Sequence, residues 1–462
     1  MDPQIQQILD WSGEPEQAAR DFSTFLNTYE TSAGQAFDLD SVNAKRLLSI
    51  FGNSNFLTHF LLRHPLEADL LLESPCIETD KKIDDYREDL SLWIPEFKEL
   101  SLNDFGKKLR HYKYREFLRL TVKDLSQAAA LENLLLEISD LAIAISEISF
   151  QYFHAQLCKE HGQPIGGFSI IAQGKLGGKE LNYSSDIDIQ FVYESDSPLE
   201  SKAPLSNHEF FAKLSEKISR FLSEKTEDGF LYRVDLNLRP EGNNGPLTNS
   251  LLGIEKYYES FGQEWERQAL IKALPIAGDV HTGKQFLEIV RPFVWRKSLD
   301  LASIEKLRAI KNQVHESVKK MPQKGFNVKL GEGGIREIEY FIQILQLLYG
   351  GKHPEMRSAS TLESLRVAEK LKLVPSRDAL QLKDAYLFLR KTEHRLQCLN
   401  ESQTHSIPTP TAEQKALARR MGYFEEDPNE ARQHFFDDLT RYRTFVQSTF
   451  ESLFNTENTE EP

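Results

Sequence analysis

Cysteine is scarce in this sequence. The 462 residues contain three cysteines, Cys76, Cys158 and Cys398. They lie far apart, and neither a CxxC pair nor a Cys/His spacing surrounds them, so the sequence predicts no disulfide framework and no structural zinc site. Thiols without disulfide partners suit a reducing compartment, and we expect a cytoplasmic protein.

Leader and membrane segments are not apparent either. The first residues, MDPQIQQILDWSGEPEQ, have no basic segment followed by an apolar one. No stretch reaches the roughly 18 consecutive apolar residues that a spanning helix needs. We therefore expect neither secretion nor a membrane partner.

Positive charge is in deficit. Lys and Arg number 56 against 70 Asp and Glu, which gives a formal net charge of −14, and no basic tract interrupts the chain. A nucleic-acid partner is therefore not expected, because the phosphate backbone binds clustered cations. Hydrophobic residues make up 40% and charged residues 27%, proportions typical of a folded globular protein.

The first part of the chain reads as helical. Apolar residues recur at helical intervals from Leu47 to Leu72, and Gly52 and Pro65 divide this stretch into two predicted short helices. A 3.6-residue period then continues from Leu125 to Cys158, which predicts a long packed helix ending near Gly162.

The pattern changes to strands after that helix. Short apolar or alternating runs predict strands over 168–172, 187–193 and 230–238, with an amphipathic helix between the second and the third. After Asp279 the helical pattern returns, with predicted helices over 303–318, 335–349 and 379–399. The sequence thus predicts an α+β fold, with a small mixed sheet embedded in a mostly helical protein and a helical bundle after it.

Four regions are expected on this basis. Residues 1–160 form a helical region that packs on the core, and 161–290 form the core with the sheet. Residues 300–455 form the helical bundle, suited to docking or regulation, and 456–462 form a disordered tail.

Two carboxylates on one strand are the most informative feature. Asp186 and Asp188 are two residues apart, so both project from the same face of the predicted strand. Asp235 lies on the polar face of the next strand and supplies a third carboxylate. Mg²⁺ prefers oxygen ligands and commonly combines one or two carboxylates with substrate phosphates, so we expect these residues to hold a pair of divalent ions.

A glycine-rich segment precedes these carboxylates. Gly174, Gly177 and Gly178 would let the backbone approach a phosphate closely, and Lys175 and Lys179 would add positive charge. Either feature alone is more often a plain turn or a solvated strand end, and the spacing is not that of a P-loop. Their combination favours a site for nucleotidyl transfer.

Other polar residues carry weaker signals. Arg239 suits either a phosphate or a strand carboxylate. Lys272 falls on a probable helix, and the family resemblance given below makes it a phosphate-side charge, whereas Glu266 and Arg267 suit a substrate or a surface ion-pair ladder equally. The segment Gly331–Gly334 with Arg336, Glu337 and Glu339 resembles an anion-binding helix start, but the acidic residues favour a structural role. For His394 and His405 we expect capping or core roles.

The segment GKLGGKELNYSSDID, residues 174–188, resembles the signature of the DNA polymerase β-like nucleotidyltransferases. It is more closely similar to the bifunctional glutamine synthetase adenylyltransferase/adenylyl-removing enzymes. Further segments agree with that family over most of the chain, at 51–65, 234–251, 257–279, 333–350 and 389–408. The segments ELNYSSDID and YYESFGQEWERQALIKA resemble the amino-terminal, adenylyl-removing half of that family's enzyme. A second GKLGG…DxD segment does not follow in this sequence.

This resemblance implies a specific activity. The chain is expected to remove AMP from an adenylylated tyrosine of glutamine synthetase by Mg²⁺-dependent phosphorolysis, which releases ADP. Phosphate and ADP are then small-molecule partners, and the PII signal protein is an expected regulator. Catalytic and metal-binding roles are implied for Asp186, Asp188 and Asp235, and nucleotide or phosphate contacts for Gly174, Lys175, Gly177, Gly178, Ser185, Arg239 and Lys272.

Two alternatives remain open. The same metal site would serve an ATP-dependent adenylyltransferase that acts on glutamine synthetase. A catalytically silent domain that senses PII or glutamine is the other, although a binding module has no need for three converging carboxylates.

Overall fold

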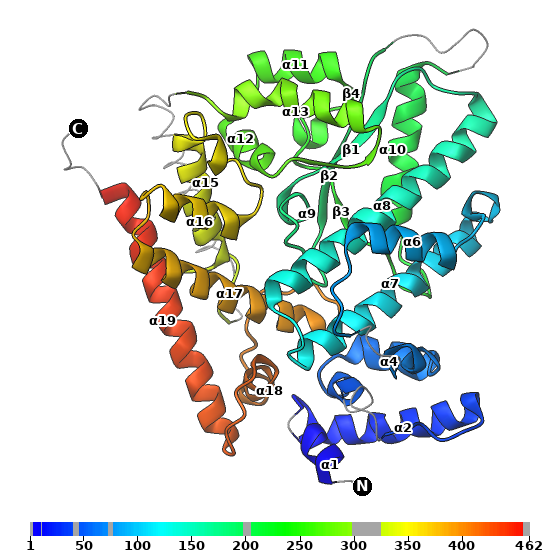
Figure 1. Cartoon of the computed structure of the whole chain (residues 1–462), viewed down its shortest axis with the longest axis vertical. Coiled ribbons are helices and arrows are strands. Elements are labelled where there is room, and N and C mark those ends of the chain that lie inside the picture. Colours follow the sequence, from blue (N-terminus) through cyan, green and yellow to red (C-terminus); the bar gives the residue numbers. More distant parts are fainter. Residues whose placement is uncertain are drawn as a thin grey trace.

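The computed structural model describes residues 3–10, 12–39, 46–72, 77–196, 205–297 and 325–455. Helices dominate these ranges, and one small mixed sheet lies among them (Figure 1). The predicted α+β fold, with a sheet inside a mostly helical protein, is confirmed. Within the described ranges, no helix is both long and apolar enough to cross a membrane.

The five-stranded sheet is built around β2 (Ile187–Tyr193). β1 (Phe168–Ala172) pairs antiparallel with β2 on one side and with β5 (Leu274–Gly278) on the other. Two short strands run parallel to β2 along its other edge. β3 (Val234–Asp235) pairs with the start of β2, and β4 (Thr248–Ser250) pairs with its end.

The predicted strands agree with the sheet in part. Those over 168–172 and 187–193 are confirmed as β1 and β2. The strand predicted over 230–238 is wrong in length, because only two of its residues pair with β2 before the chain turns away. β4 and β5 were not predicted: β4 has three residues and β5 contains Pro275, which weakens a strand pattern.

Helices cover both faces of the sheet. Alternate residues of β1 point to opposite sides, so Phe168 and Ile170 enter the largest hydrophobic core with α8 (Leu131–His161) and α10 (Asn207–Ser223). Ile171 instead joins a smaller core with α11 (Leu251–Ser260) and α13 (Val280–Val294). A strand that is buried on both faces reads as a continuous apolar run, which is why β1 was predictable.

The helices before the sheet form the wall of the largest core. They are α1 (Pro3–Asp10), α2 (Pro15–Ala33), α4 (Asn55–Arg63), α5 (Glu67–Leu72), α6 (Ile83–Trp93) and α7 (Leu102–Leu125), with the 3₁₀ turns η1 (Leu48–Ile50) and η2 (Phe97–Glu99). The two short helices predicted within 47–72 are confirmed as α4 and α5. The long helix predicted from 125 begins instead at Leu131, because α7 ends at Leu125 and a turn follows.

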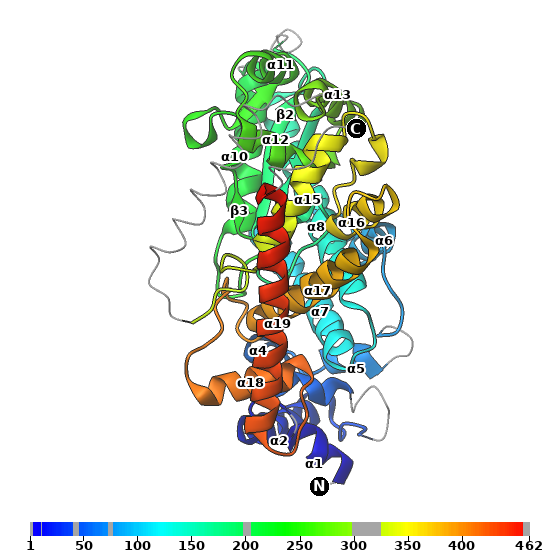
Figure 2. The same ribbon diagram turned by 90° about the vertical axis from the view of Figure 1, so that its left-hand side faces the viewer.

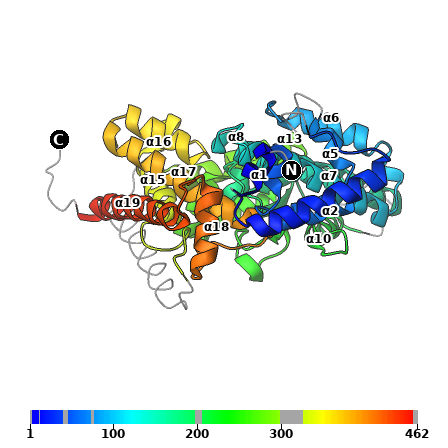
Figure 3. The same ribbon diagram turned by 90° about the horizontal axis from the view of Figure 1, so that it is seen from below.

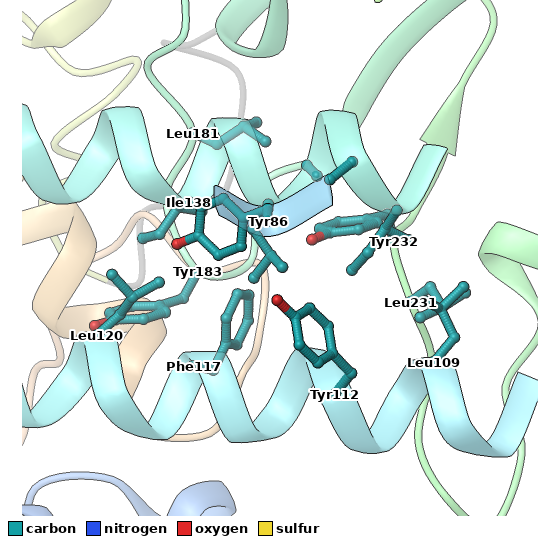
Figure 4. Close-up of a cluster of buried hydrophobic side chains, with 14 of the residues drawn as sticks. Tyr86, Leu109, Tyr112, Phe117, Leu120, Ile138, Leu181, Tyr183, Leu231 and Tyr232 are labelled. Atoms are coloured by element: carbon teal, nitrogen blue, oxygen red, sulfur yellow. The ribbon is translucent and has the colours of Figure 1, made fainter. Parts of the chain in front are cut away.

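Apolar side chains from distant segments meet between α7 and α8 (Figure 4). Phe117 and Leu120 of α7 lie opposite Ile138 of α8, with Tyr183 and Tyr232 from the segments that lead into β2 and β3. All five are buried. The segments that lead to Asp186 and Asp235 are therefore anchored in the main core by Tyr183 and Tyr232.

The last helices form a second core. They are α15 (Ile335–Tyr349), α16 (Thr361–Lys370), α17 (Ser376–Cys398), α18 (Thr411–Met421) and α19 (Pro428–Asn455), with the 3₁₀ turn η4 (Pro354–Met356). α19 runs along the length of this group (Figure 2), and α15, α16 and α19 lie on the opposite side of the molecule from α6 and α7 (Figure 3). The helices predicted over 335–349 and 379–399 are confirmed as α15 and α17. The helix predicted over 303–318 and the tail at 456–462 lie outside the described residues.

Candidate active site

The paired carboxylates lie at the edge of the sheet where β2 begins. Asp188 of β2 and Asp235 of β3 are direct partners in the parallel register, and Asp186 immediately precedes β2. Asp188 lines a cavity of about 370 Å³. Gly174 and Lys175 line the same cavity, as do Leu238, Trp265, Gln268, Ala269, Lys272, Lys329, Leu330, Arg336, Glu337, Glu339, Tyr340, Gln343 and Phe450.

Asp188 has an unfavourable environment for a negative charge. Burial raises the pKa of its carboxyl to about 7, and the charges of Asp235 and Asp186 act in the same direction. A cation bound here would offset all three effects. Mg²⁺ often takes only one or two carboxylates together with phosphate oxygens, so Asp188 and Asp235 fit such an ion.

Asp186 is held by two neighbouring side chains. Arg233 Nε lies 3.0 Å from its Oδ1, and Gln403 donates a hydrogen bond of 2.6 Å to its Oδ2. Across the described ranges, no three His, Cys, Asp or Glu side chains are gathered closely enough to form a metal site. The structure therefore brings Asp188 and Asp235 into register and keeps Asp186 engaged with Arg233.

The predicted glycine loop is a single helical turn, α9 (Gly174–Gly177), beside β2 (Figure 1). Gly174 has φ +53°, and a Cβ there would overlap the Asp188 carboxylate. A Cβ at Gly177 would overlap the backbone oxygen of Lys272, and one at Gly178 would lie 3.0 Å from the backbone oxygen of Ala359. The glycines thus allow α9 to pack tightly between the Asp188 carboxylate and the start of β5.

Lys175 is committed to an ion pair. Its Nζ lies 2.9 and 2.7 Å from the two carboxylate oxygens of Glu393, on α17. Burial lowers the pKa of Lys175 to about 8, although Glu393 opposes that effect. For Glu393, burial alone raises the pKa, but Lys175 and His405 hold it well below its usual value. This pair ties the glycine-rich turn to the helical region.

Lys272 is paired in the same way. Its Nζ lies 2.6 Å from Glu180 Oε2 and donates a hydrogen bond of 3.1 Å to the Thr361 hydroxyl. Burial raises the pKa of Glu180, but Lys272 and Arg390 lower it further than burial raises it. Lys175 and Lys272 therefore both have buried carboxylate partners, and Lys179 lies 2.9 Å from the buried Asp140.

Arg239 is held by backbone carbonyl groups. Its guanidinium donates to three backbone carbonyls, at 2.7 Å to Leu236, 3.1 Å to Pro246 and 3.3 Å to Gly245. It fixes the turn that takes the chain out of β3. Ser185 also has a local partner, since its hydroxyl accepts a 3.1 Å hydrogen bond from the Asn182 backbone.

The remaining candidates have structural surroundings. Glu266 caps α12 (Glu264–Ile271) through the Gln263 backbone, and Arg267 is buried 3.2 Å from Glu264, so neither lines the cavity. His394 is buried against the Tyr183 ring, and burial lowers its pKa to about 3. His405 lies 2.8 Å from the buried Glu393.

Sequence reasoning missed Lys329 as a site residue and assigned Arg336 a structural role. Both line the cavity that contains Asp188. The segment Gly331–Gly334 between them was the available signal, but its acidic neighbours favoured a structural interpretation. Gln403 was also missed, because its contact with Asp186 joins residues 217 positions apart.

The mixed sheet, its carboxylates on two adjacent strands and the glycine-rich turn beside a cavity together define the class as a nucleotidyltransferase. The family model for glutamate-ammonia ligase adenylyltransferase matches residues 44–289, which is more than half of the chain. The chain belongs to this family. A second family model, for PII-uridylyltransferase, matches residues 305–454.

Curated relatives support the same family assignment. Proteins called bifunctional glutamine synthetase adenylyltransferase/adenylyl-removing enzyme are 38% identical in Thioalkalivibrio sulfidiphilus, over 75% of this chain and 36% of the relative. In Pseudomonas aeruginosa the identity is 38%, over 70% of this chain and 33% of the relative. In Nitrosomonas europaea it is 35%, over 90% of this chain and 45% of the relative. The chain thus spans between about a third and a half of the length of these relatives.

Proposed function

We propose that this chain removes AMP from an adenylylated tyrosine of glutamine synthetase by Mg²⁺-dependent phosphorolysis. One observation carries the proposal: Asp188, next to Asp235 in the sheet register, faces a cavity in an environment that disfavours its negative charge. A carboxyl in such an environment is well suited to bind a divalent ion, because its negative charge would otherwise destabilise the fold. Family membership and the names of the relatives support glutamine synthetase as the substrate.

The direction of the reaction rests on sequence. ELNYSSDID at 180–188 and the block at 257–273 resemble the adenylyl-removing half of the family enzyme rather than its transferase half. An ATP-dependent transfer to glutamine synthetase is the alternative, because both reactions use the same arrangement of carboxylates.

The proposed reaction is a displacement at phosphorus. An oxygen of inorganic phosphate attacks the α-phosphorus of the adenylyl group, the bond from phosphorus to the tyrosine oxygen breaks, and the proton of the phosphate ends on the tyrosine. The products are ADP and unmodified tyrosine. Asp188, Asp235 and Asp186 would hold Mg²⁺, which would offset the negative charge of the two phosphates. For Asp186 this requires release from Arg233.

The regions of the chain have proposed roles as well. We assign the nucleotidyltransferase core to 161–290, with 1–160 packed against it and 300–455 as a docking or regulatory region. The match of residues 305–454 to the PII-uridylyltransferase model supports a link to PII signalling.

A single incubation tests the activity. The chain is mixed with adenylylated glutamine synthetase, Mg²⁺ and phosphate, and nucleotide products are separated by chromatography. We expect ADP, at a rate that saturates with phosphate concentration. Release of AMP without phosphate would indicate hydrolysis and contradict the mechanism. AMP incorporation from ATP into unmodified synthetase, without ADP formation in the first assay, would establish the opposite direction.

A further inference from the structure

The cationic side chains that line the cavity differ in whether a carboxylate already neutralises them. Lys175 and Lys272 are neutralised by Glu393 and Glu180 at 2.7 and 2.6 Å. Lys329 and Arg336 line the same cavity and have no ion-pair partner among the described residues. A phosphate that enters the cavity therefore meets two cations from the segment before and at the start of α15.

That segment is held in a fixed shape. Asn327 Oδ1 accepts hydrogen bonds from the backbone N–H groups of Lys329 and Leu330, at 3.0 and 2.8 Å. The Arg336 N–H donates to the Lys329 carbonyl at 3.0 Å, which joins the two cationic residues directly. Gly333 has φ +72°, and a Cβ there would overlap the backbone of Arg443 on α19.

The acidic residues of the cavity have partners of their own. Glu337 Oε2 accepts the Gly333 N–H at 3.1 Å, and Glu339 Oε1 accepts the Tyr386 hydroxyl at 3.4 Å. The positive charge of Lys329 lowers the pKa of Asp188, so the two groups interact within the same cavity. Trp265 and Tyr340 add aromatic surface to its wall.

We propose that Lys329 and Arg336 form a phosphate-binding subsite in the cavity that Asp188 lines, supplied by the helical region rather than by the nucleotidyltransferase sheet. The ligand is a phosphate-class anion, either the attacking inorganic phosphate or the phosphate of the adenylyl group. As a part of the reaction, this subsite rests on the proposed function. As a binding site for phosphate and ADP it can be measured independently.

Three substitutions test the subsite: Lys329→Gln, Arg336→Gln and, as a matched control, Lys383→Gln, which removes an exposed lysine on α17. Lys329 is half-buried and Arg336 is exposed, so all three proteins are expected to keep the wild-type melting temperature and circular dichroism. Arg336→Lys should retain part of the binding, because it keeps the charge and loses the bidentate geometry.

Two measurements identify the ligand. The KM for inorganic phosphate is determined with adenylylated glutamine synthetase, and the Kd for ADP with Mg²⁺ is determined by calorimetry. A rise of about ten-fold in the phosphate KM for Lys329→Gln and Arg336→Gln supports a subsite for the attacking phosphate. A similar rise in the ADP Kd alone supports a subsite for the adenylyl phosphate.

Unchanged values of both constants in the two folded variants would overturn the proposal. Failure of the proposed function would appear differently. In that case the wild-type chain would form no ADP from adenylylated synthetase, while calorimetry with ADP and with inorganic phosphate would still decide whether Lys329 and Arg336 bind them.

Discussion

Asp188 is a half-buried carboxyl with two other carboxyl groups beside it, and its protonation should be visible in protein stability. Its pKa in the folded chain is raised to about 7 from 3.8, first by burial and then by Asp235 and Asp186. Because folding raises the pKa of Asp188, the folded state favours the protonated carboxyl. The resulting contribution to the free energy of unfolding is present below pH 4 and is lost as pH rises through 7. A pKa difference of this size corresponds to at most about 4 kcal/mol.

We therefore predict that Asp188→Asn melts above the wild type at about pH 8.5 without Mg²⁺, and that this difference narrows as pH falls toward 4. Mg²⁺ should raise the melting temperature of the wild type more than that of the variant, because the ion binds the folded carboxylate. Turnover should fall by at least about 100-fold. Scanning calorimetry with and without Mg²⁺ measures both effects, and Asp384→Asn on the exposed side of α17 is the control. Equal Mg²⁺ responses of Asp188→Asn and wild type would contradict the metal assignment.

The carboxylate of Glu393 contacts side chains from distant parts of the chain. Lys175, Asn182 and His405 all contact its carboxylate, which is fully buried. We predict that Glu393→Gln lowers the free energy of unfolding by about 3–5 kcal/mol, because Lys175 is then left buried without a counter-charge. Urea unfolding of both proteins measures this difference.

Two further variants separate this charge effect from a packing defect. Glu363→Gln breaks an exposed pair with Arg366 and should cost less than about 1 kcal/mol. The double variant Glu393→Gln/Lys175→Met removes both charges and should recover part of the lost stability. A double variant that is less stable than Glu393→Gln alone would show that the charge of Lys175 is not the cause.

The sequence predicted the carboxylates of the site but not the partners of its lysines. The alternation of strand side chains placed Asp186 and Asp188 on one face, and the register then placed Asp235 opposite Asp188. The true partners of Lys175 and Lys272 were beyond reach, because Glu393 lies 218 positions from Lys175. No local pattern links such residues, so both lysines read as free cations.

At the scale of elements, α9 depends on a close approach of two backbones. Gly177 packs where a Cβ would overlap the backbone oxygen of Lys272, just before β5, and lie 3.0 Å from that of Ala172 at the end of β1. We predict that Gly177→Ala destabilises the chain by about 1–3 kcal/mol and lowers turnover, because α9 must move away from the sheet. Thermal unfolding and the ADP assay measure the two effects.

Gly253→Ala is the control for that variant. Gly253 lies in α11, where a Cβ would be 3.4 Å from the Ser250 hydroxyl, an ordinary contact. Alanine there should stabilise the helix by about 0.5–1 kcal/mol. A stable and active Gly177→Ala protein would mean that α9 does not need its tight position.

Elements were predictable where burial left a periodic pattern. β1 is a short, mostly apolar run, β2 alternates β-branched and aromatic residues with polar ones, and α15 and α17 repeat apolar residues at helical spacing. β4 and β5 carry no such pattern, because three residues are too few and a proline interrupts the other. Their positions are set by pairing with β2 and β1 rather than by their own sequence.

At the scale of the whole molecule, the helices after residue 325 share buried contacts with the helices before the sheet. Arg395 of α17 pairs with Asp124 of α7, and Lys113 of α7 lies 2.6 Å from Glu401. Ser54 donates a 2.8 Å hydrogen bond to the Cys398 carbonyl. α17 therefore completes the main core, which contains Cys398 itself. The helices after residue 325 are therefore not structurally independent of the rest of the chain.

We predict that a chain ending at residue 297 does not fold into a cooperative unit. Its Asp124 and Lys113 would lose the partners that offset their burial, and each orphaned buried charge costs several kcal/mol. The measurement is calorimetric melting of the truncated chain beside the complete chain. A matched control is the complete chain with a protease site inserted between residues 297 and 325, cleaved after folding, because cleavage keeps every contact that truncation removes. We expect the cleaved pieces to elute together and to melt as one unit. A sharp melting transition in the truncated chain, with ADP binding intact, would instead show that the sheet region folds alone and that the cavity needs neither α15 nor α17.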